Sequence, residues 1–182
     1  MMNAANIVLT FTKDDLELAQ ARTGLTDGLG VAWFEEIGLA LPVVFEINGV
    51  NLLPETPDKE EVMAVGPGGE VSGPAGLASH VAFRLPLLNV VRAGRRAVTQ
   101  ARTDGRSRWR LPGGGEVTFE LSADGTMVTV SGGPTRQVRL PVDVAASDLA
   151  EAFDRFAVAA DEYVATYLPE LIAARVWSRR GT

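Results

Sequence analysis

The sequence contains no cysteine and a single histidine, His80, and both absences limit the chemistry it can perform. Without cysteine, disulfides and thiolate metal sites are excluded. One histidine cannot form a metal site of several imidazoles, and it leaves no spare base to orient a nucleophile. We therefore expect no catalytic set, no cofactor and no metal. His80 itself is explained as a structural or exposed residue, with a catalytic base as the alternative.

The chain also has no long apolar run, and its first residues do not predict a leader sequence. Its longest apolar stretches, such as residues 37–45, reach about half of the ~20 residues that a membrane-spanning helix needs. The first six residues lack the basic region and the apolar core of a signal peptide. We expect a soluble, cytoplasmic protein without a membrane partner. Only Lys13 and Lys59 accompany the fifteen arginines, which together with abundant Ala, Gly and Val favours a GC-rich bacterial coding sequence.

The positive charges lie close together in an otherwise acidic sequence. The chain has a formal net charge of −6, yet residues 84–110 hold eight arginines and one acid, Asp104, for a net charge of +7. Residues 1–83 carry −9 and residues 111–182 carry −4. A basic segment in an acidic chain must meet opposite charge within the fold or across an interface. This arginine-rich segment, residues 84–110, is the strongest functional signal in the sequence.

Length and composition favour one globular domain. The chain has 182 residues, of which 46% are hydrophobic and 22% charged, and such a composition is typical of a globular protein. A domain of this size buries roughly 70% of its unfolded surface, which is enough for a core. We treat residues 1–182 as a single domain and residues 66–76, which are rich in glycine and proline, as a flexible surface loop.

The clearest local signal is a β-hairpin around Asn48–Gly49. Both residues tolerate the positive φ angles that a type I′ turn requires. This turn places Ile47 opposite Val50, and Phe45 opposite Leu52. These four apolar side chains then share one face of the hairpin.

A meander of strands follows the arginine-rich segment. Residues 106–111 alternate arginine with other side chains, which places Trp109 on the core side. Residues 116–121 lead into a tight turn at Asp124–Gly125 and a returning strand. Residues 136–140 form the last expected strand.

Two amphipathic helices should cover these strands. Pro86 begins one that continues to Arg102, since proline is tolerated in a first helical turn. The other begins at a capping box formed by Asp148 and Glu151, and Pro169 bends or restarts it. The sequence therefore predicts an α+β fold: a mainly antiparallel sheet, with two or more hairpins or a meander, covered by helices that include a long amphipathic C-terminal helix.

Four further elements are expected from shorter patterns. Residues 7–12 alternate as an opening strand. A short helix over residues 13–23 should stop at Gly24. Residues 33–39 are either a helix or a strand, and residues 61–65 could add another strand.

Seven arginines of the arginine-rich segment fall on two ordered faces, one of the expected helix and one of the strand that follows. We take them as the candidate interaction residues: Arg92, Arg95, Arg96 and Arg102 on the helix, and Arg106, Arg108 and Arg110 on the strand. Pairing within the fold explains the strand face, because the antiparallel register sets Arg110 opposite Glu116 and Arg106 opposite Glu120. No acidic neighbour can be named for the helix face.

Three other roles for these arginines stay open. They could contact a partner protein, hold an anionic small molecule, or track the phosphates of a nucleic acid. A sequence pI of about 4.9 and the expected burial of Trp109 both argue against nucleic acid. Among the acids, Glu35–Glu36 is the most interesting pair, because Trp33 and Phe34 precede it and burial raises the pKa of a carboxyl group. Acids that simply face solvent explain it equally well.

The C-terminal part also resembles a known class of proteins. The runs Leu140–Val144, Ser147–Leu149 and Tyr167–Leu171, placed after a strand meander, resemble the C-terminal part of small immunity proteins of bacterial polymorphic toxin systems. The similarity covers at most the last 75 or so residues, and no binding residue can be transferred from it. It implies that the protein neutralises a cognate toxin by binding it directly.

The sequence as a whole therefore favours a non-catalytic, acidic protein-binding module, either an immunity protein or a chaperone-like binder. Acidic charge speeds association with basic partners such as nuclease toxins. The alternative is an enzyme or binding protein for an anionic small molecule that uses the arginines. A second alternative is nucleic-acid binding through residues 84–110.

Overall fold

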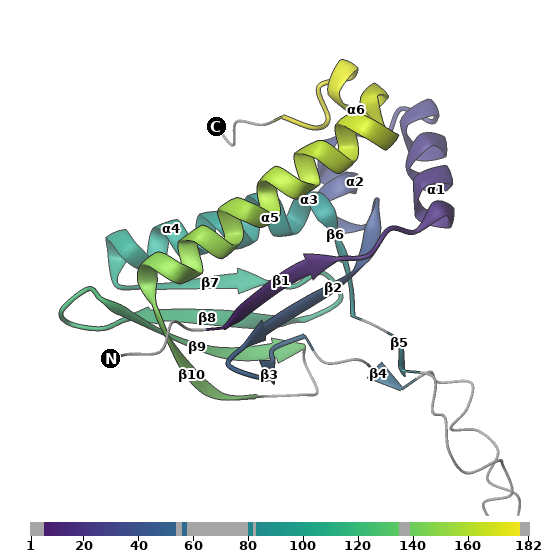
Figure 1. Ribbon diagram of the computed structural model, residues 1–182. Helices are drawn as coiled ribbons and strands as arrows, with labels where there is room; N and C mark the ends of the chain where they lie inside the picture. The colour runs from purple at the N-terminus through teal and green to yellow at the C-terminus, as the bar shows by residue number, and fades with distance from the viewer. Residues whose placement is uncertain (1–5, 54–55, 58–79, 82, 135–138, 179–182) are drawn as a thin grey trace, which may run out of the picture.

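The computed structural model describes residues 6–53, 56–57, 80–81, 83–134 and 139–178 (Figure 1). The expected strand at residues 61–65 and the expected loop at residues 66–76 lie outside the described residues, as do the first three residues of the strand expected at 136–140.

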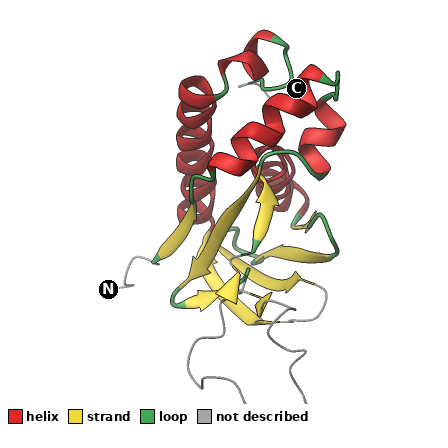
Figure 2. Ribbon diagram, turned by 90° about the vertical axis from the view of Figure 1, so that its right-hand side faces the viewer, coloured by secondary structure: helices red, strands yellow, loops and turns green. Residues whose placement is uncertain are grey.

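The chain has an α+β fold with two antiparallel sheets of four strands each, where the sequence had suggested one main sheet. The first sheet has the order β1-β2-β3, with β6 also paired to β2, and the second has the order β10-β9-β8-β7. A short pair, β4 and β5, is separate. Figure 2 shows the strands gathered in the lower part of the molecule and most of the helices above them.

The bounds of the elements are as follows. The strands are β1 (Ile7–Phe11), β2 (Ala40–Ile47), β3 (Val50–Asn51), β4 (Thr56–Pro57), β5 (His80–Val81), β6 (Arg84–Pro86), β7 (Arg106–Arg110), β8 (Gly115–Leu121), β9 (Met127–Pro134) and β10 (Arg139–Ala145). The helices are α1 (Asp15–Thr26), α2 (Val31–Glu36), α3 (Leu87–Asn89), α4 (Arg95–Asp104), α5 (Ala146–Tyr167) and α6 (Pro169–Ala173), with a π-helical turn at Val90–Gly94 between α3 and α4.

The hairpin around Asn48–Gly49 is confirmed. Asn48 has a φ of 51° and Gly49 a φ of 81°, as the type I′ turn requires. Ile47 pairs with Val50, and the Leu52 amide donates to the Phe45 carbonyl at 2.7 Å. This register turns the apolar side chains into the core.

The meander is confirmed in its register, but its last strand is longer than expected. Arg106 lies opposite Glu120 in the pairing of β7 with β8. Strand β10 continues to Ala145, past the expected end at residue 140, and it contains Pro141. The register with β9 shifts between Arg139 and Val142, and such an irregularity is where a strand tolerates proline.

The helix expected from Pro86 to Arg102 is present but is interrupted by the π-helical turn. In this segment Leu88 and Gly94 are buried, whereas Val91, which simple helical spacing places on the core side, is only half-buried. The residues after the turn follow the expected pattern, since Ala97, Val98 and Ala101 are buried.

Gly24 does not end α1, contrary to expectation. The helix continues to Thr26, and a side-chain carbon at position 24 would lie 2.7 Å from Cζ3 of Trp33. The glycine therefore lies within α1 and allows α1 and α2 to approach closely. The segment expected as helix or strand around Trp33 is helical.

The capping box expected at Asp148 is wrong. Strand β10 runs directly into α5, so that the helix begins at Ala146, after Ala145 and without a side-chain cap. Asp148 lies in the first turn instead, where the helix dipole stabilises a carboxylate. The break at Pro169 is confirmed, since α5 ends at Tyr167 and α6 begins at Pro169.

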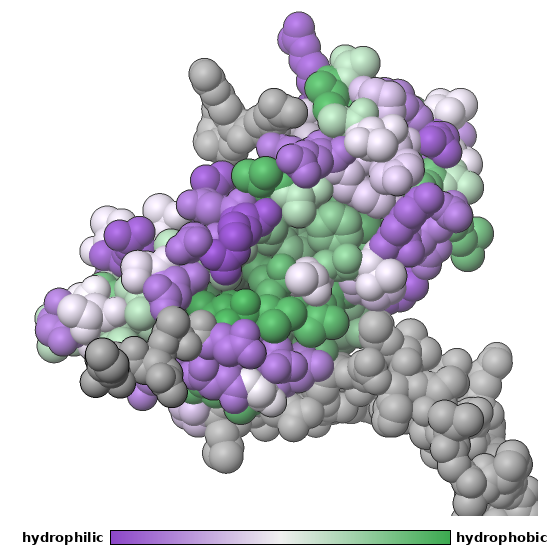
Figure 3. All heavy atoms as spheres, viewed as in Figure 1, coloured by the Kyte–Doolittle hydropathy of each residue, from purple (hydrophilic) through white to green (hydrophobic). Residues whose placement is uncertain are grey.

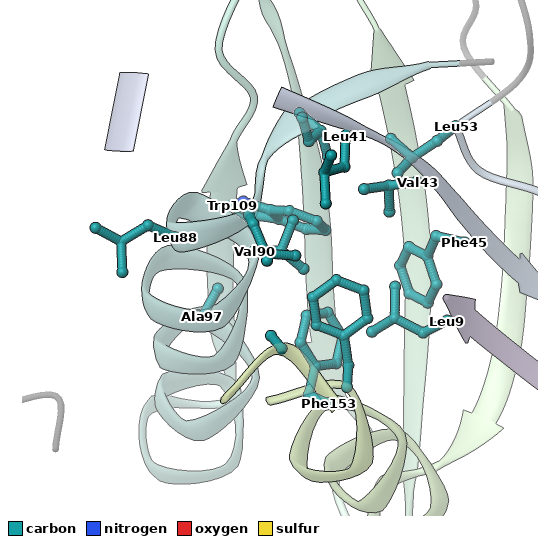
Figure 4. Close-up of a cluster of buried hydrophobic side chains, with 14 of the residues drawn as sticks. Leu9, Leu41, Val43, Phe45, Leu53, Leu88, Val90, Ala97, Trp109 and Phe153 are labelled. Atoms are coloured by element: carbon teal, nitrogen blue, oxygen red, sulfur yellow. The ribbon is translucent and has the colours of Figure 1, made fainter. Parts of the chain in front are cut away.

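The centre of the core is the Phe153 ring on α5 (Figure 4). Its centroid lies 5.7 Å from that of Phe45, 5.8 Å from that of Trp109 and 6.4 Å from that of Phe119. Trp109 is fully buried as expected, and its indole Nε1 donates to Oδ1 of Asn89 at 2.8 Å. One helix therefore joins the inner faces of both sheets.

Candidate functional site

Carboxylates of distant elements meet two of the arginines on the helix face. Arg92 Nη1 lies 2.9 Å from Oε1 of Glu35 on α2. Arg95 Nη2 lies 2.8 Å from Oδ1 of Asp154 on α5. Arg92 and Arg95 thus have acidic partners that periodicity could not identify, because these partners are about sixty residues away in the sequence.

The strand face is paired within the sheet. Arg106 Nε lies 3.0 Å from Oε1 of Glu120, as the register predicted. Glu116 lies opposite Arg110, but its ion pair is with the diagonal neighbour Arg108, at 3.5 Å. These side chains are about half exposed, and such pairs contribute only about 0.2–1 kcal/mol each.

The seven candidate arginines thus have different surroundings. Four are engaged by acids on three elements, α2, α5 and β8. For Arg96, Arg102 and Arg110, no carboxylate of the described residues lies within ion-pair distance. Each of these three side chains is exposed. Four of the seven candidate arginines therefore form ion pairs within the fold. Arg96, Arg102 and Arg110 are exposed cations without an ion-pair partner among the described residues.

Arg84 shows the same structural use of the segment. Its Nη2 lies 2.8 Å from Oδ2 of Asp14 and 3.2 Å from Oε1 of Glu17. Asp14 Oδ1 also accepts the amide N–H of Leu16 at 2.9 Å, which caps α1. The hydrogen bond from Arg84 and then those from the backbone lower the pKa of Asp14 below its ordinary value of 3.8.

Replacing Asp14 with alanine is expected to lower the free energy of unfolding by about 0.5–2 kcal/mol at neutral pH, because α1 loses its cap. A carboxyl whose pKa is lowered by folding stabilises the fold above its ordinary pKa, and the stabilisation is lost as the pH falls through the lowered value. The difference between wild type and Asp14→Ala should therefore narrow below about pH 4. Urea unfolding of both proteins at several pH values measures this difference in the free energy of unfolding. Asp14→Asn, which keeps a capping oxygen, should fall between the two; a difference independent of pH would contradict this account.

The other sequence candidates do not form a site with the arginines. Glu35 binds Arg92, while Glu36 is exposed. His80 lies in β5, where it is paired with Pro57. Within the described ranges no three His, Asp or Glu residues gather as metal ligands, and no described helix is long and apolar enough to cross a membrane.

Known proteins give no template for this arrangement. No family model, curated protein or solved structure matches the chain. The functional interpretation therefore rests on the surface of the fold itself.

The outer side of α5 carries an acidic hollow with an apolar centre. Val158 is 57% exposed at this position. The residues around the hollow are Glu151, Asp154, Arg155, Val158, Ala159 and Glu162. Three acids against one arginine make the hollow negative overall, although Arg155 is paired with Glu151 and Asp154 with Arg95.

A second hollow adjoins the first where α5 passes β1. It is lined by Leu9, Thr10, Phe11, Arg155, Phe156 and Ala159. Arg155 and Ala159 line both hollows, which makes them one continuous surface. We call the residues of the two hollows together the α5–β1 surface. Figure 3 shows apolar side chains at the centre of this face, with polar side chains around them.

Part of this surface could be predicted from the sequence. Helical spacing places Glu151, Asp154 and Glu162 on the polar side of the C-terminal helix, and Val158 with them. An apolar residue in a polar face was the available signal. The contribution of β1 could not be predicted, because the strand lies about 145 residues before α5 in the sequence.

Proposed function

We propose that this protein is a non-catalytic protein-binding module that binds a basic partner through the α5–β1 surface. The observation that carries the proposal is Val158, exposed among Glu151, Asp154 and Glu162. Apolar contact at the centre of an interface supplies affinity, while surrounding charges speed association and select the partner. An acidic rim around an apolar centre suits a partner with the opposite arrangement.

The charges of the whole chain support the same partner class. The formal net charge is −6, so that a basic protein would be attracted over long distances. The arginines that could have clamped a small anion are in large part occupied, since Arg92, Arg95, Arg106 and Arg108 bind acids of the chain itself. The remaining excess negative charge is available to a partner.

Within this class we favour an immunity protein whose partner is a basic toxin. The resemblance of the C-terminal meander and helix to immunity proteins supports this choice, and α5 is the element that carries both the resemblance and the acidic hollow. Neutralisation by occupying another protein requires no catalytic residue. A chaperone for a basic client could use the same surface.

The proposal is tested by affinity capture with charge-reversed variants. The tagged protein is incubated with a lysate of the organism that encodes it, and the binding of any retained protein is then quantified. The double variant Glu151→Lys/Glu162→Lys reverses the rim of the hollow. Asp27→Lys/Asp104→Lys changes the net charge equally at two exposed positions outside the α5–β1 surface.

We expect wild type and the Asp27/Asp104 variant to retain one basic protein in stoichiometric amount. The Glu151/Glu162 variant should bind it at least about tenfold more weakly, which corresponds to about 1.4 kcal/mol. Equal losses in both variants would show that only net charge matters. Unchanged binding by the rim variant, or no stoichiometric partner at all, would contradict the proposed function.

A further inference from the structure

Within the described part of the chain, strand β1 is paired along one edge only. Among the described residues β2 is the only strand that pairs with it. Hydrogen bonds at both ends fix the pattern, since Thr12 N donates to the Pro42 carbonyl at 3.0 Å and Asn48 N donates to the Asn6 carbonyl at 2.9 Å. In an antiparallel pair such bonds recur at every second residue. The backbone groups of residues 7, 9 and 11 therefore point away from β2.

Natural sheets protect free edges with short strands, prolines, charges and irregularities. Among the described strands of the two sheets, the other outer ones have such features: β3 has two residues, β6 has three and ends at Pro86, β10 contains Pro141 and a register shift, and β7 presents three exposed arginines. Strand β1 reads Ile-Val-Leu-Thr-Phe, with regular pairing, no charge and no proline. Its edge is the one suited to accept another strand.

The space beside this edge is part of the α5–β1 surface. Leu9, Thr10 and Phe11 line the hollow on one side, and Phe156 and Ala159 line it on the other. A strand added to β1 would place alternate side chains against these apolar residues. The acidic rim begins at once beyond them, because Arg155 and Ala159 belong to both hollows.

The lengths of strand and rim agree. In Figure 1, β1 and α5 run in roughly the same direction. Five strand residues span about 17 Å, and the helix from Glu151 to Glu162 spans about 16 Å. A single extended segment could therefore contact the whole edge of β1 and the whole rim.

We propose that β1 binds an extended basic segment of the partner protein by strand addition. The backbone of the segment pairs with residues 7, 9 and 11. On the face of the segment that points toward α5, apolar side chains lie against Phe156 and Ala159, and lysines or arginines at the ends of that same face reach the rim at Glu151, Asp154 and Glu162. This inference rests on the proposed function and specifies how the partner is held; the mode is the strand addition seen in peptide recognition generally.

Amide hydrogen exchange of the full ¹⁵N-labelled chain tests the inference. In the free protein, the amides of Ile7, Leu9 and Phe11 should exchange faster than those of Val8 and Thr10, which point toward β2. The probe is the peptide acetyl-Lys-Thr-Val-Thr-Val-Thr-Arg-amide, which places Lys, both valines and Arg on one face of the extended strand. Its binding should slow exchange of the three outward amides by at least about tenfold, and a peptide with glutamate at every basic position should leave them unchanged.

Backbone pairing is separated from simple charge attraction by two N-methylated peptides. One is methylated at the threonines and the other at the valines, so that each blocks one edge of the extended peptide. Strand addition predicts that one of the two loses binding and the other keeps it.

Several results would overturn strand addition. These are slow exchange of the three amides in the free protein, no binding at millimolar peptide, or binding that leaves the β1 amides unchanged. Slowing that grows with protein concentration alone would assign the edge to a second copy of the chain. The proposed function survives each of these results if the rim variant still loses the captured partner, and it fails separately if that variant does not.

Discussion

Replacing Phe153 with alanine is expected to lower the free energy of unfolding by about 3–5 kcal/mol. The ring is 2% exposed and packs edge-on against Phe45, Trp109 and Phe119. Phe45 belongs to the first sheet and the other two to the second. Removing the ring therefore leaves a cavity where residues of both sheets pack against α5.

Urea unfolding followed by tryptophan fluorescence measures this loss. Val158→Ala is the matched control, since it shortens an exposed side chain of the same helix and should change stability by no more than about 0.5 kcal/mol. The description of the core is wrong if Phe153→Ala costs no more than the control.

The second large effect is expected from Gly94→Ala, and its sign is the informative part. Gly94 has a φ of −62°, which any residue accepts, and helix propensity alone would favour alanine by about 1 kcal/mol. In the structure, however, a methyl group there would lie 2.7 Å from Cε1 of Phe153 and 3.2 Å from Cε2 of Trp109. We expect a net loss of about 1–3 kcal/mol from this overpacking.

A double variant tests the cause. In a Phe153→Leu background the aromatic edge is gone, so Gly94→Ala should cost measurably less than in the wild-type background. Urea unfolding of the four proteins gives the coupling. Stabilisation by Gly94→Ala, or an equal cost in both backgrounds, would contradict the close contact between the π-helical turn and α5.

Local patterns predicted those parts of the fold that local physics determines. Asn48–Gly49 fixes a hairpin because few other residue pairs accept two positive φ angles. Alternation placed Trp109 inward and set Arg106 opposite Glu120. A proline beyond the first turn of a helix removes a backbone hydrogen bond and clashes with the preceding turn. Pro169 therefore ends the long C-terminal helix. Each of these outcomes depends on residues within about fifteen positions of one another.

The features that were missed depend on distant contacts. Gly24 was expected to end α1, but it lies within the helix, where Trp33 of α2 packs against it. The π-helical turn packs Gly94 against Phe153 of α5 and Trp109 of β7, and regular helical periodicity does not include such a turn. The start of α5 moved to Ala146 because β10 feeds directly into it.

The same division applies to the candidate site. The alternation that exposes Arg106, Arg108 and Arg110 on β7 is present, but Arg92 and Arg95 of the expected helix face reach different elements, Glu35 of α2 and Asp154 of α5. Only the α5 part of the α5–β1 surface could be predicted from the sequence, because Val158 stands among the acids of that helix. The free edge of β1 became apparent only once the order of the strands was known.

Site-specific photocrosslinking tests the central claim, a partner bound at the α5–β1 surface, most directly. Benzoylphenylalanine is placed at Val158 or, as a control, at Leu16 of α1; both side chains are more than half exposed. After irradiation in a lysate of the encoding organism, the account predicts that position 158 crosslinks to one basic protein and position 16 does not. Crosslinking of the same protein from both positions, or from position 16 alone, would contradict it.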